Sequence, residues 1–381
     1  MKKLALLLTA CLILAPLAAK EGDKKKGKKP KKETIEVCFV LDTTGSMGGL
    51  IEGAKQKIWA IANEILASEP TPNLRIGLIG YRDRKEAYVT QVHDLSDDID
   101  DIYAKLMKFQ AQGGGDTPES VNQALHEAVT KIKWNKSKKV LKLVFLVGDA
   151  PPHMDYQDDV KYPEICKMAA KKNLILNTVQ CGSMASTTPV WKEIAKLAEG
   201  DYVAIAQSGG VAVISTPVDA EIAKLNRELG VTVVAYGDRR MRADVAGKIN
   251  LAAEAKEAVA ADRLSVLSLK SKSASIGYKG SASSYIDGGG DLVDELASGR
   301  VDFDDVEQEK LSEKVREMSK EERKKYLEEQ VAKRKELQKK LDELLAKRRD
   351  FVTAEKKRLA ESGKKDGFDE KVSEIISKRR R

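Results

Sequence analysis

Short apolar runs alternate with amphipathic segments of helical period between Thr34 and Leu229. We expect strands over 34–41, 74–81, 87–92, 141–147, 174–180 and 202–206, and helices over 50–68, 98–109, 118–132, 159–172, 190–198 and 217–229. Strands that alternate with helices, and a run as apolar as 143–147, are typical of a mostly parallel sheet with helices on both faces. The sequence therefore predicts an α/β fold of the Rossmann-like, doubly wound type, in which ligands bind at the carboxyl ends of the strands.

The first of these strands ends in a loop that suits a small divalent cation. Asp42 follows the apolar run, and Thr44 and Ser46 place hydroxyls at every second position after it. An amphipathic helix then begins near Leu50. Mg²⁺ binds oxygen ligands in octahedral geometry and accepts hydroxyls and waters alongside one or two carboxylates. The loop therefore predicts a set of Mg²⁺ ligands where a helix begins.

Two later loops add oxygen ligands. The glycine-rich segment 113–119 carries Asp116 and Thr117, and Thr117 is the expected N-cap of a helix with Pro118 in its first turn. Asp149 follows the apolar run 141–147, where a carboxylate needs a partner or a metal to offset desolvation. In a parallel sheet such loops meet at one edge, so we expect a single three-loop site.

The order of these three loops resembles the von Willebrand factor type A domain over residues 34–220, and most closely that of exported bacterial members. The resemblance implies the metal-ion-dependent adhesion site of that family. Its ligands would be Asp42, Thr44 and Ser46 from the first loop, Thr117 from the second, and Asp149 from the third, directly or through water.

The second loop departs from the family pattern. Many members place Thr directly after two glycines, and on that alignment Gly115 stands at the ligand position. Either Thr117 or Asp116 then completes the shell. Ligation by Asp116 would add negative charge and favour Ca²⁺ or Mn²⁺. Thr44 replaces the Ser of many members, but it keeps the oxygen.

These features predict a binding module rather than an enzyme. Ligation mainly by hydroxyls leaves the ion under-neutralised and with an open position, which an Asp or Glu of a protein partner would fill. Arg82, Asp83 and His153 lie close to the loops in sequence and are expected at the partner-binding rim. Two alternatives stay open, a scaffold that binds through its helical tail and a metal-assisted hydrolase with His153 as base.

The first residues predict export. Lys2 and Lys3 precede the apolar segment 4–19, which ends in small residues before Lys20, as in a signal peptide. The mature protein would be periplasmic or secreted and would have no transmembrane segment, and acylation of Cys11 in a lipobox is the alternative. A Cys166–Cys181 disulfide could form in an oxidising compartment, whereas Cys38 lies on a strand expected to be buried.

Charge divides the chain into an acidic middle and two basic ends. The net charge is +7 over residues 1–33, −7 over 34–310 and +8 over 311–381. We expect a signal peptide (1–19), a basic leader (20–33), the A-type domain (34–230), a helical and Ser/Gly-rich extension (231–304) and a charged long-helix or coiled-coil tail (305–381). The two basic ends favour contact with an anionic surface, and no feature indicates specific nucleic-acid binding.

The last two regions give weaker signals. A strand is expected over 231–236 and a helix over 239–263. The tail carries an apolar stripe of Leu337, Leu341, Leu344 and Phe351, too short for a confident coiled coil. Its last residues, 378–381, are all basic and are expected to fray.

Overall fold

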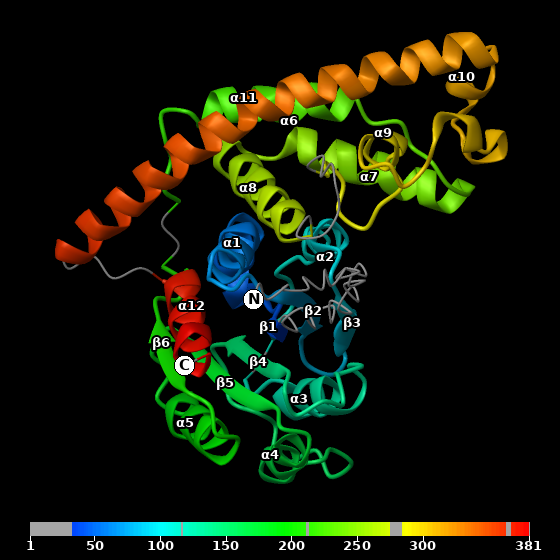
Figure 1. Ribbon diagram of the computed structural model, residues 1–381. Coiled ribbons are helices and arrows are strands. Elements are labelled where there is room, and N and C mark those ends of the chain that lie inside the picture. Colours follow the sequence, from blue (N-terminus) through cyan, green and yellow to red (C-terminus); the bar gives the residue numbers. More distant parts are fainter. Residues whose placement is uncertain (1–32, 116, 211–212, 275–283, 363–366, 381) are drawn as a thin grey trace, which may run out of the picture. The chain divides into compact units, whose positions relative to one another are not determined.

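A computed structural model describes residues 33–115, 117–210, 213–274, 284–362 and 367–380. Its centre is a six-stranded sheet in the order β3-β2-β1-β4-β5-β6 (Figure 1). All neighbouring strands are parallel except β3, which runs antiparallel to β2 at one edge. The strands are β1 (Thr34–Asp42), β2 (Asn73–Tyr81), β3 (Thr90–Ser96), β4 (Leu141–Gly148), β5 (Ile175–Cys181) and β6 (Tyr202–Ile205). The predicted mostly parallel α/β sheet is confirmed.

Helices cover both faces of the sheet because the central strands are apolar on both sides. Phe39 of β1 belongs to one apolar core and its neighbour Val40 to the other, as the alternation of side chains along a strand requires. The first core is completed by α1 (Gly48–Leu66), α2 (Ile99–Leu106) and α12 (Phe368–Arg379). The second is completed by α3 (Val121–Thr130), α4 (Tyr162–Lys171) and α5 (Thr187–Leu197).

The helix that ends the described chain, α12, returns to the sheet. Phe368, Val372, Ile375 and Ile376 are buried in the same core as Phe39, and the Phe368 and Phe39 rings meet edge to face with centroids 5.9 Å apart. The backbone N–H of Phe368 donates to the carbonyl of Gly209, just after β6. The last turn is also held, since Lys378 and Arg379 pair with Asp201 and Arg380 pairs with Glu33. The prediction of a frayed end is therefore wrong for residues 378–380.

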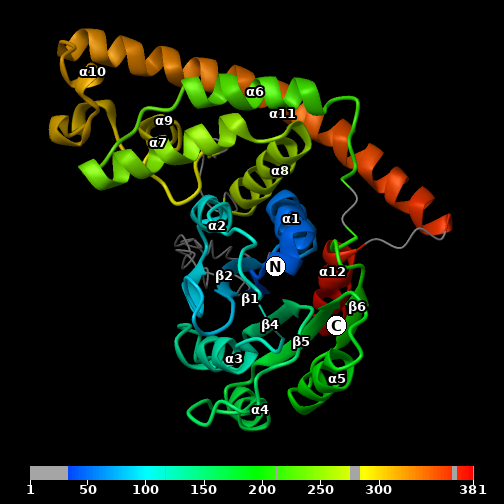
Figure 2. The same ribbon diagram turned by 180° about the vertical axis from the view of Figure 1, so that it is seen from behind.

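A second set of helices packs beside α1 and α2 (Figure 2). It comprises α6 (Asp219–Val231), α7 (Arg239–Glu254), α8 (Glu257–Ala274), α9 (Leu292–Ala297), α10 (Glu313–Arg316) and α11 (Lys320–Glu361), with short 3-10 turns at Phe303–Asp305 and Gln308–Lys310. The stripe predicted on the tail lies on α11. Leu337, Leu341 and Leu344 are buried in a core shared with α6 and α8, whereas Phe351 is 41% exposed.

Buried ion pairs join these helices to the sheet domain. Arg263 of α8 is almost fully buried and donates hydrogen bonds to both carboxylate oxygens of Asp100 on α2, at 2.7 and 2.8 Å. Lys248 of α7 lies 2.5 Å from Asp98, the N-cap of α2. Pairs of this kind are costly to break once buried, so they fix how α2 meets the second set of helices.

Several local predictions need correction. The edge strand expected over 87–92 lies at Thr90–Ser96. Residues 231–236 form no strand, because α6 runs to Val231 and only Ala235 and Tyr236 make isolated bridges. The helix expected over 239–263 is interrupted at residues 255–256 and forms α7 and α8.

The three cysteines outside the N-terminal segment are free and buried, so the Cys166–Cys181 disulfide is wrong. Burial also raises the pKa of the Cys166 thiol to about 12, which keeps it protonated. Among the described residues no helix has the length and apolarity needed to cross a membrane. The predicted signal peptide, Cys11 and the basic leader up to residue 32 lie outside the described residues.

Candidate functional site

The loop after β1 folds its polar side chains around the carboxylate of Asp42. Asp42 Oδ1 accepts hydrogen bonds from the backbone N–H of Thr44 at 2.9 Å and from the Thr44 hydroxyl at 2.6 Å. The Ser46 hydroxyl lies 3.3 Å from that of Thr44. A 3-10 turn, Gly45–Met47, then leads into α1. The three predicted first-loop ligands are therefore neighbours in the structure.

One oxygen of this carboxylate has no partner. Asp42 Oδ2 is inaccessible to solvent and forms no hydrogen bond with any described residue. A buried charged oxygen without a partner is costly, and a cation would offset that cost. Burial raises the pKa of Asp42 to about 7, opposed by the two hydrogen bonds from Thr44 and reinforced by the negative charges of Asp149 and Glu86.

Asp149, directly after β4, is tied to the first loop by Gln207. The Gln207 side-chain amide donates to Asp149 Oδ2 at 2.7 Å and lies 3.3 Å from the Ser46 carbonyl oxygen. Gln207 follows β6 at the same edge of the sheet. The sequence analysis missed this residue, and the only signal that could have found it is its position after a strand of the parallel sheet.

Gly148 leaves room for the Asp42 carboxylate. A Cβ at this position would lie 2.5 Å from the hydroxyl of Tyr81 and 2.9 Å from Cβ of Asp42. The Tyr81 hydroxyl is buried and has no hydrogen-bond partner among the described residues. Strands β1, β2 and β4 thus bring Asp42, Tyr81 and Asp149 together, as the register of the sheet predicts.

The glycine-rich second loop lies against the first. The Gly113 carbonyl accepts a hydrogen bond from the backbone N–H of Gly45 at 3.2 Å, and a Cβ on Gly114 would lie 3.2 Å from that of Thr44. Both glycines have positive φ, 79° and 82°, which favours glycine. The carboxylate of Glu86 fixes the loop by accepting from the Gly114 N–H at 2.6 Å.

The second-loop ligand itself stays a prediction. Thr117 is exposed, and Asp116 lies outside the described residues. Thr117 is not the N-cap of the following helix, because α3 begins at Val121 after Ser120. Gly115 stands at the family's ligand position, and a Cβ added to it would have no atom within 4 Å.

A second buried carboxylate, Glu119, faces the site. One of its oxygens, Oε2, is buried without a partner, like Asp42 Oδ2. Burial first, and then the negative charges of Asp42, Asp83, Glu86 and Asp149, raise the pKa of Glu119 to about 9. Acidic side chains therefore crowd this site, and Glu119 holds a proton at neutral pH when no cation is bound. Glu119 stands two residues after Thr117, but nothing in the sequence marked it as buried.

The donor set fits a small, hard cation. No three His, Cys, Asp or Glu side chains among the described residues are grouped so that they could hold a metal by themselves. The oxygens available at the loops are the free Asp42 oxygen, the hydroxyls of Thr44 and Ser46, and Asp149. An ion held there would take hydroxyl and water oxygens beside the carboxylates, which Mg²⁺ accepts.

A match to a known family covers this part of the chain. Residues 36–217 match the model of the von Willebrand factor A domain. This segment is a von Willebrand factor A domain. The A domain includes the sheet, the three loops and Gln207.

Individual relatives of this A domain are distant. An Acanthamoeba polyphaga mimivirus protein named as an ariadne-like RING finger protein is 30% identical over 119 residues, which span 31% of this chain and only 11% of the mimivirus protein. Three solved structures are each 14% identical over 46% of this chain. They are the SpRpn10 VWA domain, a mussel byssus proximal thread matrix protein and an aerotolerance-related membrane protein of Bacteroides fragilis, with TM-scores of 0.35, 0.33 and 0.32 and coverage of 89%, 42% and 92% of those chains.

The residues predicted at the rim lie behind the loops of the A domain. Arg82, Asp83 and His153 are only 4%, 5% and 7% exposed. Arg82 donates to the carbonyl oxygens of Thr43 at 3.1 Å and Gln110 at 2.7 Å, and so it holds the first two loops together.

Asp83 and His153 brace the third loop in the same way. Asp83 accepts hydrogen bonds from the hydroxyls of Ser120 and Tyr156, each at 2.7 Å. The His153 ring stacks on Tyr156 and its Nδ1 lies 2.7 Å from an oxygen of Asp155. A loop sequence shows charge but does not show which neighbouring side chains will cover it, so the burial of these three residues was not foreseen. Their place at a partner-binding rim stays a prediction.

Proposed function

We propose that this A domain captures an acidic side chain of a protein partner through a divalent cation, with Mg²⁺ the preferred ion. Asp42, Thr44, Ser46 and Asp149 would hold the ion, and Thr117 or Asp116 would complete the shell from the second loop. The unpartnered, buried Oδ2 of Asp42 is the observation that carries the proposal, because it leaves a charge that a cation would offset. The A domain supplies the independent reason to expect protein binding.

The capture step follows from the kind of ligands in the loops. Hydroxyl groups carry no charge, so an ion ligated mainly by hydroxyls and water keeps much of its positive charge. A carboxylate from a partner would replace a water and neutralise that charge, whereas a neutral side chain would gain less. If Asp116 is the second-loop ligand, the site is more negative, binds Ca²⁺ or Mn²⁺ more readily and attracts the partner carboxylate less.

We also propose that the protein acts outside the cytoplasm, periplasmic or secreted. The support is the charged and apolar order of residues 2–19 and the small residues before Lys20. Sequencing of the mature N-terminus tests this, since cleavage after residue 19 gives Lys20 first. A mature protein that starts at an acylated Cys11 would support the lipid anchor instead.

The two alternatives gain less support. A scaffold that binds through the apolar stripe of its tail would need that stripe free, but Leu337, Leu341 and Leu344 are buried within the chain itself. A hydrolase with His153 as base would need that side chain to reach a substrate, but His153 is buried and stacked on Tyr156. We therefore propose binding without turnover, and turnover by the purified protein that is lost in His153→Ala would contradict it.

Capture of partners in the presence and absence of EDTA tests the proposal. The full chain, Asp42→Ala and the control Asp350→Ala are immobilised and incubated with the extracytoplasmic fraction. Asp350 is an exposed carboxylate on α11, so this control changes charge equally without touching the loops. We expect the wild type and the control to retain a partner that EDTA releases and added Mg²⁺ restores, and Asp42→Ala to retain none. A partner that is retained equally with EDTA and by Asp42→Ala would overturn the proposal.

A further inference from the structure

The edge of the A domain opposite the candidate cation site is rich in exposed lysines. The loop between α3 and β4, residues 131–140, contains five lysines and no acidic residue. All five are exposed, namely Lys131, Lys133, Lys136, Lys138 and Lys139. This loop precedes β4, so it lies at the amino edge of the parallel strands, and the backbone N–H of Asn135 donates to Glu36 near the start of β1 at 2.8 Å.

Other lysines join this loop at the same edge. Lys171 and Lys172 precede β5, and the Lys172 ammonium donates to the Val129 carbonyl at the end of α3, at 2.6 Å. Lys196 lies in the last turn of α5, whose end meets the start of β5 through a hydrogen bond from the Leu176 N–H to the Ala198 carbonyl. We call these eight exposed side chains the lysine edge: Lys131, Lys133, Lys136, Lys138, Lys139, Lys171, Lys172 and Lys196.

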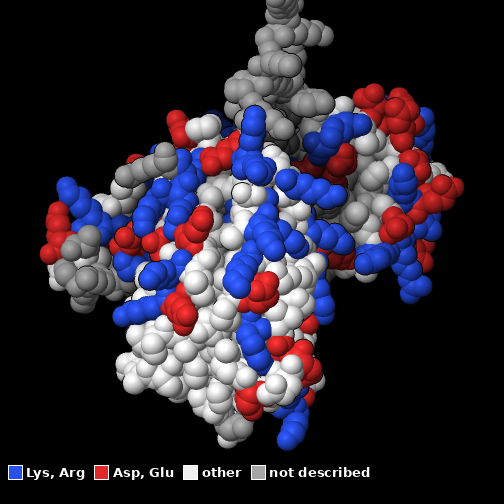
Figure 3. Space-filling view, turned by 90° about the horizontal axis from the view of Figure 1, so that it is seen from below, with Lys and Arg blue, Asp and Glu red and all other residues white. Residues whose placement is uncertain are grey.

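Most of this charge is not neutralised within the chain. Lys131 pairs with Glu127 and Lys133 with Asp94. The other six have no ion-pair partner among the described residues. Figure 3 shows a face of the molecule whose upper part carries many Lys and Arg side chains, with some Asp and Glu side chains among them, above a broad area with few charges.

Glu33, the first residue that the structure describes, lies at this edge too. The Glu33 carbonyl accepts a hydrogen bond from the backbone N–H of Asn73 at the start of β2, and the Glu33 carboxylate forms an ion pair with Arg380 at the end of α12. Residues 20–32, which precede Glu33, contain eight lysines against two acidic residues, a net charge of +6. In sequence, a cationic stretch therefore comes directly before the strands whose amino ends form this edge.

The opposite edge carries the reverse charge. Asp42, Glu86 and Asp149 gather at the candidate cation site, with Asp155 and Asp158 exposed nearby. An anionic surface would attract the lysine edge and repel the loop edge. Electrostatics alone would thus orient the domain with its loops pointing away from such a surface.

We infer that the lysine edge docks the A domain onto an anionic phospholipid bilayer and leaves the candidate cation site facing away from it. A cluster of four to eight basic side chains attracts anionic lipid head groups, and each side chain near the surface contributes about 1 kcal/mol. Export, as proposed above, would bring these lysines to a phospholipid surface rather than to nucleic acid, and this favours a bilayer as the partner. This inference does not depend on the proposed cation-mediated capture.

Vesicle sedimentation with matched charge reversals tests the inference. The loop variant Lys136→Glu/Lys138→Glu/Lys139→Glu removes three exposed lysines without an ion-pair partner. The control Lys333→Glu/Lys335→Glu/Lys339→Glu makes the same change in net charge on exposed lysines of α11, which also have no ion-pair partner among the described residues. Equal thermal melting temperatures would show that both variants fold like the wild type.

We expect the wild type and the control to sediment with vesicles of phosphatidylcholine and phosphatidylglycerol, but not with phosphatidylcholine alone. The loop variant should bind about a hundredfold more weakly, because each basic side chain near the surface contributes about 1 kcal/mol. High salt should release the wild type, and EDTA or Asp42→Ala should leave binding unchanged. Equal losses in the two variants, an unchanged loop variant, or tighter binding to duplex DNA at the same salt would overturn the inference.

Discussion

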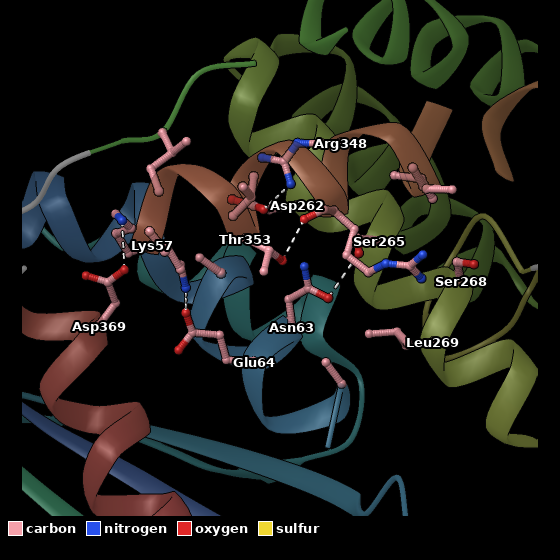
Figure 4. Close-up of a pocket in the computed structure, with 18 of the residues that line it drawn as sticks. Lys57, Asn63, Glu64, Asp262, Ser265, Ser268, Leu269, Arg348, Thr353 and Asp369 are labelled. Atoms are coloured by element: carbon pink, nitrogen blue, oxygen red, sulfur yellow. Dashed lines mark hydrogen bonds and ion pairs between the residues drawn. The ribbon is translucent and has the colours of Figure 1, made fainter. Parts of the chain in front are cut away.

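Lys57 on α1 and Asp369 on α12 form a buried ion pair, with 2.7 Å between Nζ and Oδ2, across 312 positions of sequence. Figure 4 shows the pair at one end of a cavity of about 280 Å³, which is also lined by Asp262 of α8 and Arg348 of α11. The other oxygen of Asp369 has no hydrogen-bond partner among the described residues. The pair therefore ties the last helix of the chain to the first helix of the A domain.

Loss of Lys57 alone should destabilise the protein. Lys57→Met keeps most of the side-chain volume but leaves Asp369 charged, buried and unpaired, at a cost of about 3 kcal/mol. Urea denaturation measures this loss. The double variant Lys57→Met/Asp369→Leu should regain much of it, and Lys55→Met, whose partner Glu52 is 66% exposed, should change little. A single variant as stable as the wild type would show that the ion pair contributes nothing.

The apolar face of α12 should contribute more than the exposed end of α11. Phe368→Ala removes a buried ring from the core against Phe39 and should lower the free energy of unfolding by about 3 kcal/mol. Phe351→Ala, at a ring that is 41% exposed, should lower it much less. Equal effects of the two substitutions in urea denaturation would mean that α12 does not pack on the sheet.

Substitution by alanine should destabilise the protein at one glycine beside the loops and have little effect at another. Gly148→Ala places a methyl group 2.5 Å from the Tyr81 hydroxyl and should destabilise the A domain by about 1–3 kcal/mol. Gly115→Ala meets no atom within 4 Å and should leave stability almost unchanged. Thermal unfolding of the two variants checks this. A stable Gly148→Ala would mean that Asp42 and Tyr81 lie further from β4 than the structure shows.

The stability of the protein should fall with rising pH because of Asp294, one of two buried carboxylates that pair with the same guanidinium. Arg334 lies 2.9 Å from Asp291 and 2.8 Å from Asp294. Burial and then the charge of Asp291 raise the pKa of Asp294 to about 7 from its ordinary 3.8, against the opposing effect of Arg334. The folded protein thus holds a proton that the unfolded chain has already released. The stability from this proton is complete below the unfolded pKa and is lost as pH rises through about 7.

Urea denaturation from pH 4 to pH 8 checks this, because Asp294→Asn cannot release a proton and should show a smaller fall in stability than the wild type. Asp350→Asn, at an exposed site on α11, should follow the wild type. If Asp294→Asn and the wild type lose stability identically with rising pH, then Asp294 does not hold this proton in the folded protein.

The sheet and the first loop could be predicted because their signals are local. The apolar run that ends at Asp42 fixes a buried strand, and the rule that ligands bind at the carboxyl ends of parallel strands brings Asp149 to the same edge. Thr44 and Ser46 follow from their spacing after Asp42. Each of these residues is marked in the sequence by the strand that directly precedes its loop.

Gln207, Glu119 and α12 depend on contacts that periodicity does not record. Gln207 reaches Asp149 only because β6 lies two places from β4 in the sheet, so that the loops after these two strands lie at the same edge. Glu119 is buried by the loops folding over it, and its position between Pro118 and Ser120 gives no sign of a buried site. Apolar residues recur around Phe368 in sequence, but its partner Phe39 is more than three hundred residues away. The sequence near Phe368 does not show that α12 packs on the sheet, or on which face.

Calorimetric titration with Mn²⁺ and Mg²⁺ tests the central claim most directly. The wild type, Asp42→Asn and the control Asp350→Asn are each freed of metal and titrated at neutral pH. We predict one divalent cation bound per chain by the wild type and the control, and a loss of at least tenfold in affinity for Asp42→Asn, since a ligand carboxylate becomes a neutral amide. Heat of binding that is absent from the wild type, or that is equal in all three proteins, would contradict a cation site in the loop Asp42–Ser46.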